Sequence, residues 1–380
     1  MRKGPLLKLL LPLSTIVILF IWSVGDLSFF SNWALRDPNG IHCSESHMLA
    51  DQPATSGRVK LVLFYKFPEF YELEPASGVR IFDSCEKKCE LTVNETRFKD
   101  ADAVVFYSHK NLFNLVTPPE KRNGQKWVFF AVESPVYSEN SGFGSSKWHG
   151  KFDWTMSYRY DSEFWHGYVR TKQRETPASS EQKTDDTRRW KEGFSNKTKM
   201  VAWFVSHCVT DSRREKYAAE LSKHIPVDIY GDCGTLRCDD REQCLRMLDR
   251  DYKFYLSFEN SLCKDYVTEK LLNVLQRNSL IPVVRGGADY KKLFPAGSVI
   301  DTGDFSSPES LARYLKQLAG NEEDYIKRLQ WSWQYQITGP NLPLCPLCKK
   351  LYAQREPSCV YNNVYSWWTR NICYPPRDYY

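Results

Sequence analysis

Short apolar segments alternate with helical segments along most of this chain, and this alternation restricts the fold more than any other feature. The first half contains VKLVLFYKF (59–67), ADAVVFYS (101–108) and KWVFFAVESP (126–135), each bounded by polar turns. Short, nearly continuous apolar runs are typical of strands that are covered on both faces of a parallel sheet. The first half therefore predicts an open parallel sheet with helices on both faces.

A second series of the same kind follows a polar segment. MVAWFVS (200–206) and VDIYG (227–231) are strand-like, and SRREKYAAELSKHI (212–225) between them has helix-forming composition. FYLSF, LIPVVRGG and SVIDTG continue the alternation, and a helical segment broken near Gly320 ends it. This order predicts a second parallel sheet. The polar segment between the two series, 172–198, predicts an interdomain linker or a long surface loop.

The N-terminus has the pattern of a membrane anchor. Arg2, Lys3 and Lys8 precede the uncharged stretch LLLPLSTIVILFIWSVG (9–25). Positive charge before such a stretch and a large domain after it predict a type II topology, with a cleaved signal peptide as the alternative. The fold class is therefore α/β, with two Rossmann-like domains that face a cleft, preceded by one transmembrane helix. The predicted parts are a cytosolic tail (1–8), a signal-anchor (9–29), a stem (30–57), an N-terminal domain (58–171), a linker (172–198), a C-terminal domain (199–335) and a cysteine-rich tail (336–380).

The chain has twelve cysteines, which favours an oxidising compartment. Two close pairs, Cys85 with Cys89 and Cys345 with Cys348, have no histidine nearby at metal-ligand spacing, so we predict disulfides rather than zinc. Their connectivity stays open.

Two other sequence features bear on the compartment and on the partners of the protein. The sequons at Asn94 and Asn196 are predicted glycosylation sites in a lumenal domain. The formal net charge is +6 and the sequence has no dense Lys/Arg tract, which argues against a nucleic-acid partner.

A highly charged stretch, FENSLCKDYVTEK (258–270), directly follows the predicted strand FYLSF. Ligands of open parallel sheets bind beyond the carboxyl ends of the strands and at helix N-termini. We expect a helix from Tyr266, capped by Asp265, that buries Val267, Leu271, Val274 and Leu275. Its other face would present Tyr266, Glu269, Lys270 and Asn273 to a nucleotide. A solvated helix face is the alternative.

This stretch, followed by LIPVVRGG, resembles the signature of the α-1,3-fucosyltransferases, inverting enzymes of the two-domain GT-B fold that use GDP-fucose. FAVESP resembles the acceptor-side motif of that family, and FDWTMSYRYDS (152–162) resembles the segment that follows it. FVSHC, RREKYAAEL and VDIYGDCG resemble the start of its donor domain. The motifs occur in order over roughly residues 100–350, which is far more specific than one motif.

The resemblance implies a role for individual residues. Glu133 matches the general base, which must take the proton of the attacking sugar hydroxyl. Arg214 matches the residue that binds the diphosphate, with Arg213 as an adjacent alternative. His207 stands where the family more often has Asn, which leaves its role open. The donor-binding candidates are Arg214, Asn260, Tyr266, Glu269 and Lys270, followed by Arg213, His207 and Glu259.

No metal site is expected. The two Asp-x-Asp sequences, Asp100–Asp102 and Asp249–Asp251, precede strands and would lie at the wrong edge of each sheet. Cationic side chains would neutralise the phosphates instead, so no cofactor is required, although this leaves room for stimulation by Mn²⁺.

The resulting hypothesis is a Golgi type II membrane enzyme with a lumenal catalytic domain. It would transfer L-fucose from GDP-fucose, in α-1,3 linkage and with inversion, to GlcNAc in the N-glycan core or in a LacNAc or LacdiNAc antenna. The alternatives are a protein O-fucosyltransferase of the same family, an inactive glycan-binding paralogue and a membrane-anchored adhesion ectodomain. The last would show repeated sandwich strands rather than strand–helix alternation.

Overall fold

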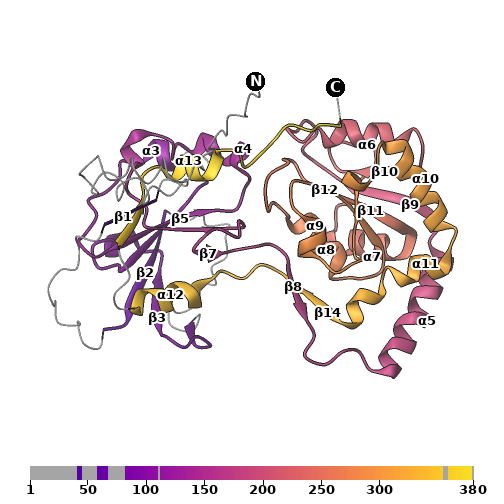
Figure 1. The fold of residues 1–380 in the computed structure, drawn as a ribbon, viewed down its shortest axis with the longest axis horizontal. Helices are drawn as coiled ribbons and strands as arrows, with labels where there is room; N and C mark the ends of the chain where they lie inside the picture. The colour runs from indigo at the N-terminus through magenta and orange to yellow at the C-terminus, as the bar shows by residue number, and fades with distance from the viewer. Residues whose placement is uncertain (1–40, 45–57, 67–81, 110–111, 354–357, 379–380) are drawn as a thin grey trace, which may run out of the picture.

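The computed structural model describes residues 41–44, 58–66, 82–109, 112–353 and 358–378. Two α/β units lie side by side (Figure 1). Within these ranges, no helix has the length and apolarity needed to cross a bilayer. The predicted tail and signal-anchor lie outside the described residues, as does most of the predicted stem.

The first unit contains a six-stranded sheet in which all neighbouring strands are parallel. Its central strands, β4 and β5, are almost completely buried because helices and loops cover both faces. This is the first sheet predicted from the apolar runs. In spatial order the strands are β3 (Cys89–Thr92), β2 (Lys60–Tyr65), β4 (Ala103–Tyr107), β5 (Lys126–Ala131), β6 (Trp154–Ser157) and β7 (Phe164–Trp165).

The second unit contains a five-stranded parallel sheet with helices on both faces. Residues of β11 enter two different cores: Phe254, Leu256 and Phe258 pack with α6 and α10, whereas Tyr252 and Tyr255 pack with α7 and α8. In spatial order the strands are β10 (Val227–Tyr230), β9 (Lys199–Phe204), β11 (Tyr252–Phe258), β12 (Ile281–Arg285) and β13 (Ile300–Asp301). The covering helices are α6 (Arg214–Ser222), α7 (Arg241–Asp251), α8 (Glu269–Leu275) and α10 (Pro308–Ala319).

The composition of the polar segment 172–198 predicted a linker or a long surface loop, but the segment is mainly helical. Most of it forms helix α5 (Ser180–Asn196), which is capped by the Ser179 side chain. The helix fully buries one residue, Trp190, in the core of the second unit, and Phe194 packs beside it half-buried. Two such residues are too few to give the sequence an apolar stripe. The chain passes from the first unit to the second just before α5. There β8 (Arg170–Gln173) pairs with β14 (Tyr335–Thr338).

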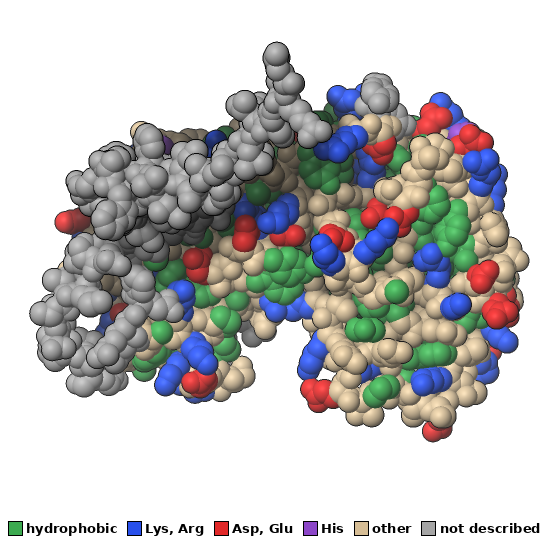
Figure 2. All heavy atoms as spheres, viewed as in Figure 1, with side chains coloured by type: hydrophobic (Ala, Val, Ile, Leu, Met, Phe, Trp, Pro, Cys, Tyr) green, Lys and Arg blue, Asp and Glu red, His purple; other side chains and the backbone are tan. Residues whose placement is uncertain are grey.

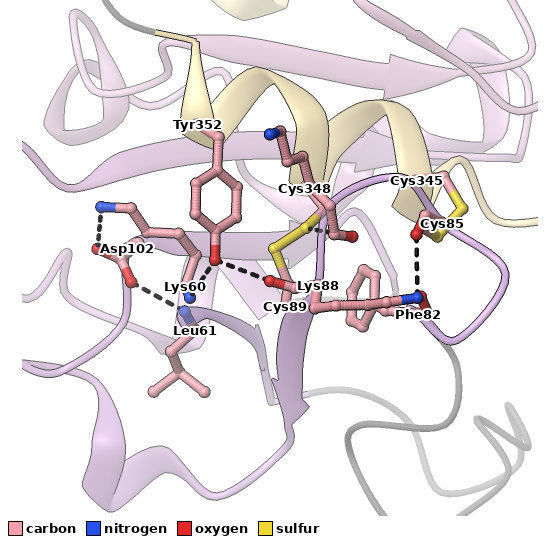
Figure 3. The surroundings of a disulfide bond; sticks show 11 residues. Lys60, Leu61, Phe82, Cys85, Lys88, Cys89, Asp102, Cys345, Cys348 and Tyr352 are labelled. Carbon is pink, nitrogen blue, oxygen red and sulfur yellow. Dashed lines mark hydrogen bonds and ion pairs between the residues drawn. A yellow bond between two sulfur atoms is a disulfide. The ribbon is translucent and has the colours of Figure 1, made fainter. Parts of the chain in front are cut away.

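The C-terminal tail returns to the first unit, where α12 (Leu344–Tyr352) and α13 (Val364–Thr369) pack (Figure 1). Disulfides Cys85–Cys345 and Cys89–Cys348 attach α12 to the segment before β3 and to the first residue of β3 (Figure 3). The Tyr352 hydroxyl also donates to the Lys88 carbonyl at 2.8 Å. The prediction that these four cysteines form disulfides is confirmed, and the structure supplies their pairing.

Short elements complete the described chain. Strand β1 (Ile41–Ser44), inside the predicted stem, pairs antiparallel with β15 (Ser358–Tyr361). The predicted break near Gly320 is confirmed, because α10 ends there and α11 follows. The remaining elements are η3 (Glu95–Arg97), α3 (Leu112–Leu115), α4 (Pro135–Ser138), η4 (Glu139–Ser141), η5 (Ser146–Trp148), α9 (Tyr290–Leu293), η6 (Thr302–Asp304), α11 (Glu322–Lys327) and η7 (Gln330–Trp333).

The carboxyl ends of the two sheets face each other. The turn after β5 meets the loop after β11, where the hydroxyls of Ser134 and Ser261 share a hydrogen bond of 2.8 Å. The chain after β6 also reaches this loop, since the rings of Tyr158 and Tyr266 lie 4.9 Å apart between centroids. Figure 2 shows acidic and basic side chains interspersed over the face in view, and a notch between the units at its lower edge.

Candidate active site

A pocket of about 450 Å³ lies at the carboxyl edge of the second sheet; we call it the donor-side pocket. Its walls are the chain just after β9 and β10, helix α7 and the first turn of α8. The sheet order reverses between β9 and β11, which is where open α/β sheets bind ligands. The charged residues that line the pocket are Arg214, Asp239, Arg241, Glu269 and Lys270.

Arg214 is the first residue of α6 and is only 4% exposed. Its Nη1 donates to the Phe258 carbonyl at 2.8 Å and its Nη2 to the His207 carbonyl at 3.2 Å. Its Nε has no hydrogen-bond partner among the described residues. Burial lowers the pKa of Arg214, although an arginine remains protonated at neutral pH. The Arg214 guanidinium is therefore a buried cation, held by the end of β11 at the pocket wall, whose Nε–H has no hydrogen-bond acceptor among the described residues.

The Glu259 side chain is buried and bound by neighbouring residues, so it is not open to solvent. It follows β11, is 1% exposed, and accepts hydrogen bonds from Thr268 N at 2.8 Å and Thr268 Oγ1 at 3.0 Å. The Lys270 ammonium lies 3.2 Å from its Oε2. Burial raises the pKa of Glu259, and the charge of Lys270 opposes that rise. We infer that Glu259 holds the start of α8 and Lys270 instead of contacting a ligand directly.

Lys270 and its neighbours form the α8 side of the pocket. The Lys270 Nζ also contacts Thr268 Oγ1 at 2.7 Å and Glu269 Oε1 at 3.0 Å. Burial alone would lower the pKa of Lys270, but Glu259 and Glu269 together raise it, so the ammonium stays charged. The Glu269 side chain is 52% exposed and available to a ligand. Arg241 of α7 donates to Asn273 Oδ1 at 3.1 Å, which joins the two helices.

Tyr266 does not share this face, contrary to the prediction. It is 1% exposed, packs in the core of the first unit, and is not among the residues that line the donor-side pocket. Its hydroxyl donates to Glu133 Oε2 at 3.1 Å. Burial raises the pKa of Tyr266 well above its usual value, so the phenol remains protonated. Tyr266 therefore joins the donor-side signature to Glu133 instead of lining the pocket.

The helix of the signature begins later than expected, and Asp265 does not cap it. Asp265 has a left-handed φ of 62°, and its carboxylate accepts from the Tyr160 backbone N–H at 3.3 Å. Cys263 forms a disulfide with Cys373. These tertiary contacts occupy residues 263–266, so α8 starts at Glu269. Its buried face includes Leu271, Val274 and Leu275, as predicted.

Glu133 lies two residues beyond Ala131, the last residue of β5. Its side chain is exposed, and Pro135 begins the short helix α4 just after it. A strand end and a proline turn thus present a carboxylate at the boundary between the units. The hydrogen bond from Tyr266 fixes its direction, which is the arrangement that a general base needs.

The remaining candidates lie around this centre. Arg213 is exposed with a left-handed φ of 48°, and lines a different pocket from Arg214. His207 is exposed, and its ring lies 5.2 Å from the Tyr137 ring. The Asn260 side chain accepts from Ser261 Oγ at 3.2 Å, and Asn260 does not line the donor-side pocket.

Two disulfides tie down loops around the donor-side pocket. Cys208–Cys233 joins the loop after β9 to the loop after β10, and Cys238–Cys244 closes the turn that begins α7. The cysteine clustering was visible in the sequence, whereas the pairing depends on the distance between loops. The wall residues Arg241 and Asp239 were missed, because an isolated charged pair near a helix start has no distinguishing pattern.

Neither Asp-x-Asp sequence contributes to this pocket. Asp102 lies at the start of β4, where its carboxylate accepts from the Leu61 N–H at 2.8 Å and pairs with Arg58. Asp249 pairs with Arg277 near the start of β11. The described residues contain no group of three or more His, Cys, Asp or Glu side chains arranged to hold a metal ion.

Two family models match this chain. The fucosyltransferase N-terminal model matches residues 57–169, and the glycosyltransferase family 10 (fucosyltransferase) C-terminal model matches residues 194–367. The first covers the unit that carries Glu133, and the second covers the unit that carries the donor-side pocket.

Curated relatives give the same result. The chain is 38% identical over 307 residues to α-(1,3)-fucosyltransferase C of Drosophila melanogaster, covering 74% of this chain and 69% of the relative. It is 33% identical to glycoprotein 3-α-L-fucosyltransferase A of the same species, covering 83% of this chain and 61% of the relative. It is 30% identical to 4-galactosyl-N-acetylglucosaminide 3-α-L-fucosyltransferase FUT5 of Gorilla gorilla gorilla, covering 88% and 85%.

The fold also has a solved counterpart. A crystal structure of an α1,3-fucosyltransferase with GDP-fucose superposes with a TM-score of 0.50 at 16% identity, covering 81% of this chain and 95% of that one. This supports the α/β glycosyltransferase fold with two parallel sheets. The family models and the named relatives show that this chain belongs to glycosyltransferase family 10, the fucosyltransferases, among relatives named α-1,3-fucosyltransferases.

Proposed function

We propose that this α-1,3-fucosyltransferase transfers L-fucose from GDP-β-L-fucose, with inversion at C1, to a GlcNAc of glycoprotein glycans. One observation carries the proposal. The hydrogen bond from Tyr266 to Glu133 orients a carboxylate at the unit boundary, and Tyr266 belongs to the segment that leads into α8, which lines the cationic pocket. A base and a site for an anionic leaving group are the two parts that this reaction requires.

The donor-side pocket fits a nucleoside diphosphate. Arg214 and Lys270 supply positive charge at the carboxyl edge of the sheet, where they would bind the diphosphate and offset the charge that develops on departing GDP. The exposed carboxylate of Glu269 would accept hydrogen bonds from ribose hydroxyls. Glu259 would act indirectly, because it fixes Lys270 from behind.

Glu133 would act on the acceptor. As the acceptor hydroxyl oxygen bonds to fucose C1, its proton passes to the Glu133 carboxylate and the bond from C1 to the phosphate oxygen breaks. The electron pair of that bond leaves with GDP. Attack opposite to the leaving group inverts C1, and no covalent enzyme intermediate is formed.

The cellular setting is part of the proposal. We propose a single-pass type II anchor in the Golgi membrane with both units in the lumen. The disulfides that join described residues support an oxidising compartment. The Asn94 and Asn196 side chains are exposed and accessible to glycosylation. The full chain expressed in secretory cells is expected to lose mass on treatment with an N-glycan hydrolase; an unchanged mass would contradict the lumenal placement.

The activity can be tested directly. We expect the purified chain, given GDP-fucose, to fucosylate a glycan array that includes N-acetyllactosamine, LacdiNAc and core chitobiose glycopeptides, with release of one GDP per transfer. Linkage analysis of the product should show an α-1,3 bond. Binding to the array without GDP release would favour an inactive glycan-binding protein, and transfer only to peptide hydroxyls would favour a protein O-fucosyltransferase.

A further inference from the structure

A second pocket, of about 520 Å³, lies between the two units; we call it the inter-unit pocket. One wall is Val136 of α4, three residues after Glu133. The opposite wall is the loop before α6, which contributes Asp211 and Arg213. Ser261, which is hydrogen-bonded to Ser134 in the turn after Glu133, lines it as well. The pocket therefore borders the segment that carries the proposed base, and it shares no lining residue with the donor-side pocket.

The third wall is the C-terminal strap, residues 371–378, which crosses from α13 back to the second unit. Cys373 is disulfide-bonded to Cys263, and the Tyr374 N–H donates to the Leu262 carbonyl at 3.0 Å. Arg285, only 5% exposed at the end of β12, pairs with the Asp378 carboxylate through both terminal nitrogens. The strap is therefore fixed at two points, and it lies beyond residue 367, where the family match ends.

The two adjacent arginines face different pockets. Arg214 is buried and lines the donor-side pocket, whereas Arg213 is exposed and lines the inter-unit pocket. The left-handed backbone at Arg213 marks the point where the chain turns into α6. The sequence offered the two residues as alternatives for one task, and the structure assigns them to opposite sides of the loop.

The lining of the inter-unit pocket suits a sugar. The Tyr374 side chain is 44% exposed and is followed by Pro375 and Pro376, which give a firm apolar surface. A pyranose ring has an apolar C–H face that packs on an aromatic ring, and hydroxyl groups around its rim. Asp211 and Arg213 supply an acceptor and a planar set of donors for those hydroxyls. The volume lies within the usual range for ligand sites.

We propose that the inter-unit pocket binds the acceptor glycan, with Tyr374 packing against a sugar ring and Asp211 and Arg213 binding its hydroxyls. This inference rests on the proposed function and deepens it, because it assigns acceptor recognition to the C-terminal strap. The sugar bound there presents its hydroxyl toward Glu133, while GDP-fucose occupies the donor-side pocket.

Steady-state kinetics of the full chain test the role of Tyr374. With N-acetyllactosamine and a core chitobiose glycopeptide as acceptors, Tyr374→Ala is expected to raise the acceptor KM about tenfold, the loss of one aromatic contact. The KM for GDP-fucose should stay within about twofold of wild type. Tyr374→Phe is expected to restore the acceptor KM, because it retains the ring. Leu115→Ala, at an exposed apolar residue of the first unit, is the matched control.

Arg213 provides an independent test. Arg213→Ala is expected to raise the acceptor KM and leave GDP affinity unchanged, with Arg188→Ala on exposed α5 as the matched control. Weaker GDP binding by Arg213→Ala would place this residue at the donor and overturn the assignment. Unchanged acceptor KM in both Arg213→Ala and Tyr374→Ala would also overturn it.

Failure of the inference is distinguishable from failure of the proposed function. If wild type transfers fucose but the variants keep its acceptor KM, only the acceptor pocket is wrong. If wild type transfers no fucose to any glycan, the proposed function itself fails. A lower unfolding midpoint of Tyr374→Ala, with both KM values unchanged, would mean that the strap is structural only, which also overturns the inference.

Discussion

At the scale of single residues, the charged side chains of the site are of two kinds. Some are buried and hold neighbouring residues in place, and others are exposed and can contact a substrate. Glu259 is fully enclosed and its carboxylate is already satisfied by Thr268 and Lys270. Glu133 and Glu269 are exposed, so their carboxylates can meet a substrate. Removing one member of a buried pair leaves the other charge uncompensated, which is costly. Glu259 is therefore expected to matter for folding, and Glu133 for chemistry.

The clearest residue-level prediction concerns Glu133. Glu133→Gln keeps a side-chain oxygen that can accept from Tyr266 but cannot take a proton. Transfer is expected to fall by about 10²–10⁴-fold, the usual contribution of a positioned base. GDP affinity and thermal stability should be unchanged, as measured by calorimetry on the same preparation. Near wild-type transfer by this variant would mean that the base lies elsewhere.

A second prediction separates the cations of the donor-side pocket from surface cations. Lys270→Ala and Arg214→Lys are each expected to weaken GDP binding by roughly 10-fold to 100-fold, because a charge-assisted hydrogen bond is lost or loosened. Titration calorimetry with GDP measures this. Arg250→Ala, at a mostly exposed arginine paired with Asp251, is the control. Unchanged affinity in both pocket variants would reject the proposed diphosphate site.

A third prediction concerns His166, which is 4% exposed near the crossing between units. Burial lowers the pKa of His166 from 6.5 to about 4, while the Asn341 carbonyl at 3.2 Å favours the protonated ring. The unfolded chain therefore binds a proton near pH 6.5 that the folded chain binds only near pH 4. The free energy of unfolding is expected to fall as pH drops through this window, by at most about 3 kcal/mol from this residue.

Urea titrations at several pH values measure the effect of His166. His166→Gln keeps a donor for Asn341 but does not titrate, so the difference between wild type and variant isolates the histidine. That difference should change steadily from about pH 6.5 to about pH 4. A constant difference across the window would mean that the folded protein protonates His166 normally.

At the scale of elements, α12 shows how a short helix gains a fixed position far from its neighbours in sequence. Two disulfides join it to β3 and the segment before it, with sequence separations of 260 and 259. Figure 3 shows both bonds on the same side of the helix, next to Tyr352 and its partners. Because the first bond already closes the long loop, the second closes only a short one and restricts the unfolded chain about half as much.

This predicts a strongly non-additive stability. Replacing Cys89 and Cys348 by Ala is expected to cost about 2–3 kcal/mol, because with Cys85–Cys345 intact that bond closes only a short loop. Removing both bonds is expected to cost about 8 kcal/mol in the chain-entropy description. Urea unfolding of the three proteins measures this. Equal costs for the first and second bond removed would contradict the shared-loop explanation.

At the scale of the whole molecule, the chain passes between the units three times. It crosses at β8, returns after β14 to α12, and crosses again as the C-terminal strap. The carboxyl edges of both sheets are consequently held face to face by covalent and hydrogen-bonded links. The proposed base and the donor-side pocket belong to different units, so their relative position depends on these crossings.

The last prediction is that transfer persists in excess EDTA. Arg214 and Lys270 already supply positive charge at the donor-side pocket, so a divalent cation would add to existing neutralisation. Activity measured after dialysis against EDTA should remain, with Mn²⁺ giving at most a stimulation. Complete loss that Mn²⁺ restores would contradict this account and require metal ligands that the described residues do not provide.

The sequence by itself determined the two parallel sheets, the family and the cysteines of the α12 disulfides. Buried strands need continuous apolar runs, and a family signature is a short run of adjacent residues. Both can therefore be recognised from the sequence without knowledge of tertiary contacts. Tertiary structure decided the rest. Helix α5 fully buries a single side chain, Trp190, and α8 starts late because Cys263 and Tyr266 make contacts elsewhere. Arg213 and Arg214 line different pockets because the chain turns between them. Each depends on contacts between residues far apart in the chain, which no local pattern records.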